Sequence, residues 1–550
     1  MALRRRARQR QQSLWIASDD LEAAPRNRFY EALDRLLAEG DFDRVSEDVC
    51  APYYQSEHTP GRPSIPPGVY FRMLLVGYFE GIESERGICW RCADSLSLRA
   101  FLGLSLSERV PDHSSLSRIR SRLPVSVFTT VFELVLDIVA KHGLLSGRVM
   151  GIDSTFMRAD ASMKAIVRRD SGEGYREFIT RLASEDAGRA VSAEEARAFD
   201  RTRVKRTSNR EWVSSTDADA RIARLKDGRT RLAYKTEHVL DLETQALLSA
   251  RILPADAGDS ETLVSGVAAA NAQLARIQAN ANPDAITAAS PAGSEIVADA
   301  AAGSERDPVA APDTTSTLAS PATPEADEDD PPPDAPGGGT TPRAPAGASS
   351  TLENDADAPA LESAVNDQRV VADKGYHKAR CIRELKEAGY RTVIPERAQR
   401  GKRRWRDKGG RATALAVYQN AWRTQRALGK RWLRKRGEVV ERSFAHTLDT
   451  GGSRRTRLRG LANVQKRYSI TAAAANLGLV LRTLLGYGTP RGLHDRVRCD
   501  EAAFDRPTNP NHHPTRPYRP LAILHALHQR LLSLAPAWPQ QHHGLLTTTC

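Results

Sequence analysis

Two aspartates stand where short apolar segments of this 550-residue chain end. Asp153 follows residues 148–152, and Asp373 follows residues 369–372. Both segments are predicted to be strands, and in α/β sheets functional groups gather where strand ends open onto a crevice. Because turns also favour aspartate for local hydrogen bonds, either residue alone is a weak indication of a site.

A third carboxylate lies in the segment 434–444, which is predicted to be helical. Its apolar stripe would consist of Leu433, Val440, Phe444 and Leu448. Glu441 falls on the neighbouring face, from which it can point into a cleft. Two alternatives stay open: Glu441 forms an ordinary ion pair on the helix surface, or Glu438, one turn earlier, is the third carboxylate.

Together the three carboxylates indicate a metal site. Hard oxygen ligands combined with phosphate oxygens suit Mg²⁺ or Mn²⁺, which keep octahedral oxygen shells. Two such ions about 3.5–4 Å apart activate an attacking water or 3′-OH and stabilise the leaving oxygen of a phosphodiester. We therefore expect Asp153, Asp373 and Glu441 to bind Mg²⁺ (or Mn²⁺), as two ions, and to carry phosphodiester chemistry.

Positive charge accumulates next to the third carboxylate. Between residues 397 and 442 the chain has 16 Lys or Arg residues and three acids. Three tryptophans are interleaved with them: Trp405, Trp422 and Trp432. Tryptophan beside arginine suits stacking on splayed or flipped bases, although tryptophan is more often a core residue. We predict DNA contacts from Arg404, Trp405 and Arg434.

The first 145 residues indicate an all-α unit. Pro111 breaks the chain and Asp112 is a good N-cap, so a helix is expected to begin there. This helix would present Arg118 and Arg122, the two DNA contacts that we predict in this unit. A short basic helix after a turn resembles the second helix of a helix-turn-helix, and an ordinary surface helix is the alternative.

From residue 146 the spacing of hydrophobic residues changes, and short predicted strands alternate with helices, as in an α/β layer structure. Two hairpin-like strands are expected at 232–242 and 247–253, and strands followed by crossover helices imply a mixed sheet. The predicted domains are a helical DNA-binding unit (1–145), a first part of the core (146–279), an insert (280–362), a second part of the core with the basic region (363–489) and a poorly ordered tail (490–550).

The net charge of +12 is the sum of an acidic segment and a strongly basic remainder of the chain. Residues 280–362 have 16 acids, two arginines and 13 prolines, hence a net charge of −14 and a composition typical of disorder. The other residues carry +26. Such a basic body favours a polyanionic partner, because phosphate contacts release counterions.

Other classes of protein are excluded or disfavoured. No run of 18 apolar residues occurs, so no membrane span is expected, and no apolar segment follows the arginines at residues 4–10, so no secretory signal is expected. Six cysteines are too few for a disulfide framework, and Cys89 and Cys92 have no zinc-ligand partners and are expected to be a buried pair. For His238 a structural role and a place in the site both stay open.

The sequence resembles the DDE transposases of bacterial insertion sequences, which have an RNase H-like catalytic core. The resemblance covers most of residues 10–490 apart from the acidic insert. In the N-terminal unit it rests on residues 61–68 and 111–118. In the core it rests on the segments that contain Asp153, His238, Asp373 and Glu441, in this order along the chain.

The resemblance implies a role for each carboxylate. Asp153 and Asp373 match the two catalytic aspartates, Glu441 matches the glutamate that closes the triad, and Arg442 matches an arginine that contacts phosphate. It also implies double-stranded DNA (the terminal repeats and the target) as partner, a homodimer in the synaptic complex and action in the cytoplasm at the nucleoid. The alternative is a catalytically inactive DNA-binding protein derived from such an element.

Overall fold

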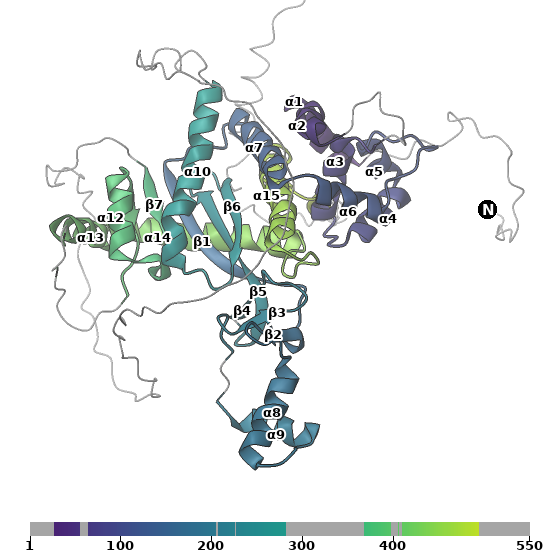
Figure 1. Cartoon of the computed structure of the whole chain (residues 1–550). Helices are drawn as coiled ribbons and strands as arrows, with labels where there is room; N and C mark the ends of the chain where they lie inside the picture. Colours follow the sequence, from purple (N-terminus) through teal and green to yellow (C-terminus); the bar gives the residue numbers. More distant parts are fainter. Residues whose placement is uncertain are drawn as a thin grey trace, which may run out of the picture. The chain divides into compact units, whose positions relative to one another are not determined.

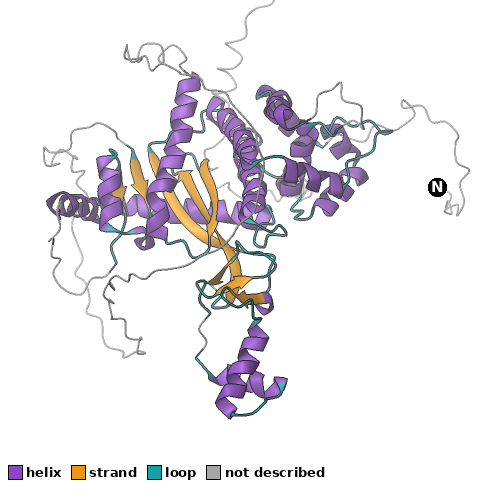
Figure 2. Cartoon of the chain, viewed as in Figure 1, coloured by secondary structure: helices purple, strands orange, loops and turns teal. Residues whose placement is uncertain are grey.

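A computed structural model describes residues 27–54, 64–204, 207–225, 227–281, 368–397, 405 and 410–493. Figure 2 shows them as helices, strands and loops. The chain divides into two compact units, 1–488 and 489–550, and the fold described below is that of the first. The predicted insert (280–362) and tail (490–550) lie almost entirely outside the described residues.

The N-terminal unit is helical, as predicted. Its helices are α1 (Arg28–Glu39), α2 (Phe42–Cys50), η2 (Ala51–Tyr53), α3 (Pro67–Phe79), α4 (Glu85–Asp94), α5 (Leu96–Phe101), α6 (His113–Arg122) and α7 (Val125–Lys141). Asp112 caps α6 as expected, because its side chain accepts from the Ser115 amide at 2.9 Å. The connection 102–112 before α6 is longer than the roughly three- to four-residue turn of a helix-turn-helix. The predicted helix-turn-helix is therefore not formed by α5 and α6, because the connection between them is too long.

A buried arginine holds these helices together. Arg72 on α3 is 7% exposed and forms ion pairs with Asp34 of α1 at 2.6 Å and Asp43 of α2 at 2.7 Å. It also donates to the Phe101 carbonyl at the end of α5. One planar donor group thus ties three helices to α3.

The core contains a mixed sheet, as predicted. Its strand order is β4-β5-β1-β7-β8, with β6 paired to β5. The strands are β1 (Val149–Arg158), β4 (Arg221–Arg224), β5 (Thr230–Asp241), β6 (Leu247–Pro254), β7 (Arg369–Val371) and β8 (Arg391–Val393). β1 is antiparallel to β5 and parallel to β7.

The first strand is longer than the sequence indicates. We expected it to end at Asp153, but β1 continues to Arg158 because residues 153–158 pair with β5. Its parallel neighbour β7 stops at Val371, opposite Gly151. Asp153 therefore lies just beyond the point where the parallel ladder ends, inside an antiparallel ladder that continues.

Helices cover both faces of the sheet (Figure 1). On one face, α10 (Asp259–Ala281) and α12 (Ala379–Glu387) pack on an apolar cluster that includes Ile152 and Val370. The other face is covered by α14 (Ala427–Phe444), a π-helix (Ala445–Thr450) and α15 (Leu461–Leu485). The helix α13 (Gly410–Gln425) lies between α12 and α14 in contact with both.

The polar stretch after β1 also folds. It forms a two-stranded sheet of β2 (Ile166–Arg168) and β3 (Trp212–Ser214), and the helices α8 (Tyr175–Ala187) and α9 (Ala193–Thr202). The two helices pack around Ile179, Ala183 and Ala196.

The helix α15 is long and apolar enough to cross a membrane, but it packs against α7 and β6 inside the protein. Residues of α15 such as Val464, Ile470 and Leu477 are almost completely buried. It has the character of a core helix.

Candidate active site

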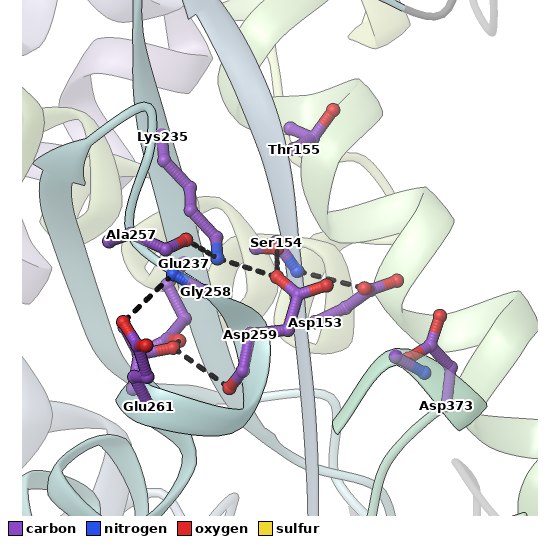
Figure 3. A network of polar contacts seen from close by, with 12 residues as sticks. Asp153, Ser154, Thr155, Lys235, Glu237, Ala257, Gly258, Asp259, Glu261 and Asp373 are labelled. Carbon is purple, nitrogen blue, oxygen red and sulfur yellow. Dashed lines mark hydrogen bonds and ion pairs between the residues drawn. The ribbon is translucent and has the colours of Figure 1, made fainter. Parts of the chain in front are cut away.

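The two aspartates follow the point at which the parallel strands β1 and β7 stop pairing. In the ladder between β1 and β7, Gly151 is the partner of Val371. Asp153 lies two residues after Gly151 within β1, and Asp373 lies two residues after Val371 in the turn that follows β7, so the strand alternation directs both toward the same face of the sheet. Figure 3 shows both side chains in one view. Asp153 and Asp373 are far apart in the sequence, so it is the pairing of β1 with β7 that brings their segments together.

Each aspartate is oriented by a backbone amide. Asp153 Oδ1 accepts from the Ser154 amide at 2.8 Å, and Asp373 Oδ1 accepts from the Gly375 amide at 2.7 Å. The Asp153 side chain is 27% exposed, which leaves it accessible to a ligand from solvent.

Asp153 also has a cationic partner, which the sequence did not single out. Arg436 of α14 is 9% exposed; its Nη2 lies 2.8 Å from Asp153 Oδ2, and its Nε donates to the Ile152 carbonyl at 3.1 Å. In the sequence Arg436 is one of the charges of the basic stretch 397–442. The only signal for its position is that it precedes the buried Val440 by four residues and so shares its face of the helix.

Glu441 does not join the aspartates in this structure. The side of α14 that packs on the core carries Trp432, Arg436, Val439 and Val440, and Glu441 is exposed. Its carboxylate has no hydrogen bond or ion pair to any described residue. In the described part of the chain no three His, Cys, Asp or Glu side chains are placed to hold a metal ion together. Glu438, the alternative third carboxylate, forms an ion pair with Arg442 at 2.5 Å.

The predicted DNA contacts are distributed over several elements. Arg118 donates to Ser114 on α6, and the Arg122 guanidinium lies 4.9 Å from the centroid of the Tyr54 ring. Trp405 donates to the Tyr418 hydroxyl, and Arg442 donates to Gln245. Arg434 is exposed on α14. Arg404 lies outside the described residues.

A second polar cluster next to Asp153 was missed by the sequence reasoning. Lys235 of β5 is 3% exposed, and its Nζ lies 2.5 Å from a carboxylate oxygen of Asp259, the first residue of α10. Glu237, two residues along β5 and 1% exposed, binds Arg251 and Thr262. An alternation of charged residues along a strand suggests a solvent-facing edge, so the sequence gives no warning that these side chains are buried.

His238 is a structural residue. It is fully buried, stacks on Phe444 with 4.2 Å between ring centroids, and lies 2.9 Å from Ser443 Oγ and 2.6 Å from the Tyr468 hydroxyl. Burial lowers the pKa of His238 to about 3, so the ring is neutral. It joins α14 and α15 to β5, at the position directly opposite Asp153 in the ladder with β1.

Acid should therefore destabilise this core. The unfolded chain binds a proton on His238 below its ordinary pKa of about 6.5, whereas the folded protein does not until about pH 3. The free energy of unfolding is then lost as pH falls through this window, by roughly 2 kcal/mol at pH 5. Denaturant unfolding between pH 7.5 and 5 measures this loss. His238→Gln should flatten the pH dependence and His113→Gln, on the surface of α6, should not; equal slopes for both would contradict the assignment.

The two cysteines of the CxxC sequence lie on α4. Cys92 is buried and Cys89 is half-buried. Burial raises the pKa of the Cys89 thiol to about 11 and that of the Cys92 thiol to about 12. Both thiols are therefore protonated at neutral pH, and a protonated thiol is a poor nucleophile.

The residues present suit a hard divalent cation. Asp153 and Asp373 supply only carboxylate oxygens, and both are partly exposed. Mg²⁺ binds through one or two carboxylates and keeps several waters, so two adjacent aspartates fit it.

Comparison with known proteins yields two family matches. Residues 19–122 match the family described as "Transposase domain (DUF772)". Residues 348–477 match the family described as "Transposase DDE domain", and this match contains Asp373 and Glu441. Asp153 lies outside both matches. No curated protein and no solved structure matches the chain.

Proposed function

Because the chain belongs to the DDE transposases of insertion sequences, we propose that it binds the ends of its element and catalyses metal-dependent DNA cleavage and strand transfer. The core would be RNase H-like, and Asp153, Asp373 and Glu441 would form the triad. The observation that supports this proposal is the parallel register of β1 and β7, in which Gly151 is opposite Val371 and each strand leads two residues later to one of the two aspartates.

The chain's own residues have distinct tasks in this proposal. Asp153 and Asp373 would hold Mg²⁺ or Mn²⁺, two ions in the complete site, and the bound metal would supply Lewis-acid stabilisation of the phosphodiester. The Ser154 and Gly375 amides fix the directions of the two carboxylates. Arg436 balances the charge of Asp153.

DNA would be held by basic residues of the N-terminal unit and of the basic region before Glu441. Arg118 and Arg122 on α6 would contact the terminal repeats, and Arg404, Trp405, Arg434 and Arg442 would contact DNA near the cleavage site. We propose a homodimer in the synaptic complex, because each element has two ends, and action on DNA at the bacterial nucleoid.

The test is cleavage of linear DNA that carries the element's terminal repeats. Purified protein with Mg²⁺ should release 3′-OH ends at the element boundary, with no product in EDTA or on DNA of scrambled end sequence. Binding without metal-dependent nicking would overturn the enzyme and support the second candidate, a catalytically inactive DNA-binding protein. The position of Glu441 outside the pair of aspartates is the observation that favours this second candidate.

A further inference from the structure

The carboxylate of Asp259 is anchored through one oxygen. Oδ1 accepts from the Ser154 hydroxyl at 2.8 Å and lies 2.5 Å from Lys235 Nζ (Figure 3). Lys235 also donates to the Ala257 carbonyl at 2.7 Å, which fixes the turn that leads into α10. The anchor therefore consists of a buried ammonium and a hydroxyl that directly follows Asp153.

The second oxygen of Asp259 faces the turn after Asp373. A Cβ atom built on Gly375 would lie 2.9 Å from Asp259 Oδ2 and 2.9 Å from Asp373 Oδ1. Only glycine allows both carboxylates to approach the chain so closely at this point. Asp259 thus contacts the residue after Asp153 and approaches the turn of Asp373, although it belongs to neither strand.

A buried tyrosine lies beside this group. Tyr376 is completely buried, and its hydroxyl faces Ser154, whose own hydroxyl donates to Asp259. Burial and the charges of Glu237, Asp259 and Asp153 raise the pKa of Tyr376, so the phenol is neutral and can donate.

We propose that Asp259 is a positioning residue of the metal site, whose free oxygen accepts hydrogen bonds from waters bound to the ion at Asp153 and Asp373. This inference rests on the proposed function. Mg²⁺ keeps several waters when it binds through one or two carboxylates. Carboxylates in the outer shell typically change metal affinity or activity by about 10- to 100-fold.

The simpler explanation is that Asp259 only neutralises Lys235. A buried ammonium needs a counterion, and removing one partner of such a pair destabilises the fold. The two roles predict different results when both charges are removed together, because a charge-balancing pair then becomes dispensable while a positioning carboxylate does not.

The experiment compares Asp259→Asn, Lys235→Met and the double variant. Binding of Mn²⁺ to the full-length protein is measured by electron paramagnetic resonance, and stability by thermal unfolding. Asp259→Asn keeps the Ser154 contact but loses the charge, so Mn²⁺ affinity should fall about 10-fold or more. The double variant should regain stability relative to Asp259→Asn and still bind Mn²⁺ weakly.

Wild-type Mn²⁺ affinity in the double variant would overturn the positioning role. Asp256→Asn is the matched control, because Asp256 lies on the same turn, is 43% exposed and is 3.8 Å from Arg221; its Mn²⁺ affinity should equal that of the wild type. If the wild-type protein itself bound no Mn²⁺, the proposed function would fail rather than this inference alone.

Discussion

Asp373→Asn should abolish metal-dependent cleavage, with a loss of about a thousandfold or more, while the protein remains folded and bound to DNA. The metal's stabilisation of a phosphoryl transition state amounts to several kcal/mol, and each 1.36 kcal/mol is about tenfold in rate. Asparagine keeps the size of aspartate and can still accept from the Gly375 amide. The charge at the end of β7 is the only property removed.

Asp153→Asn should lose as much activity but also some stability. Arg436 is buried and would lose its counterion, whereas Asp373 has no such arginine partner among the ion pairs of the described residues. The two variants are compared by cleavage of element-end DNA on denaturing gels, by DNA binding and by thermal unfolding. Cleavage at the wild-type rate by Asp373→Asn would remove this residue from the site.

Two neighbouring strands of the core were predictable from the sequence because of their hairpin-like spacing. The predicted strands 232–242 and 247–253 correspond to β5 and β6. The mostly apolar residues 461–485 form the helix α15. A local pattern of apolar residues is sufficient to predict a helix or strand where burial of that element determines its structure.

The elements that the sequence missed have polar surfaces. α8 and α9 bury only a few small or aliphatic side chains between them, such as Ile179 and Ala196, and most of their other residues are polar or charged. Likewise, the extension of β1 beyond Asp153 depends on pairing with β5 rather than on its own composition.

The candidate site was predictable only in part, for a physical reason. Aspartates at strand ends can be recognised from local sequence, but their partners depend on tertiary packing. Arg436 and Lys235 are both buried cations that the sequence presents as ordinary basic residues. Whether a charge is solvated or paired inside the fold is decided by residues far along the chain.

The positions of the three carboxylates predict that metal binding by the free protein and DNA cleavage depend on different residues. Asp153 and Asp373 are adjacent before any ligand binds, while Glu441 is exposed on α14 and has no partner among the described residues. Metal affinity of the free protein should therefore depend on the aspartates and not on Glu441. Cleavage, if the triad assignment is right, should depend on all three.

Glu441→Gln should consequently bind Mn²⁺ like the wild type in the absence of DNA and yet lose cleavage by about a thousandfold, as the aspartate variants do. Glu438→Gln is the matched control on the same helix. Glu438 is engaged by Arg442, so its loss should change cleavage little, as expected for an exposed ion pair worth about 0.5 kcal/mol.

The same two variants decide between the alternatives for the third carboxylate. Loss of cleavage in Glu438→Gln together with activity in Glu441→Gln would move the assignment by one helical turn. Loss in Glu441→Gln with unchanged Mn²⁺ affinity would require α14 to shift when DNA binds, because Glu441 must then approach the aspartates. The π-helix that directly follows α14 is a place where such a shift can be accommodated, since an i→i+5 turn holds one residue more than an α-helical turn.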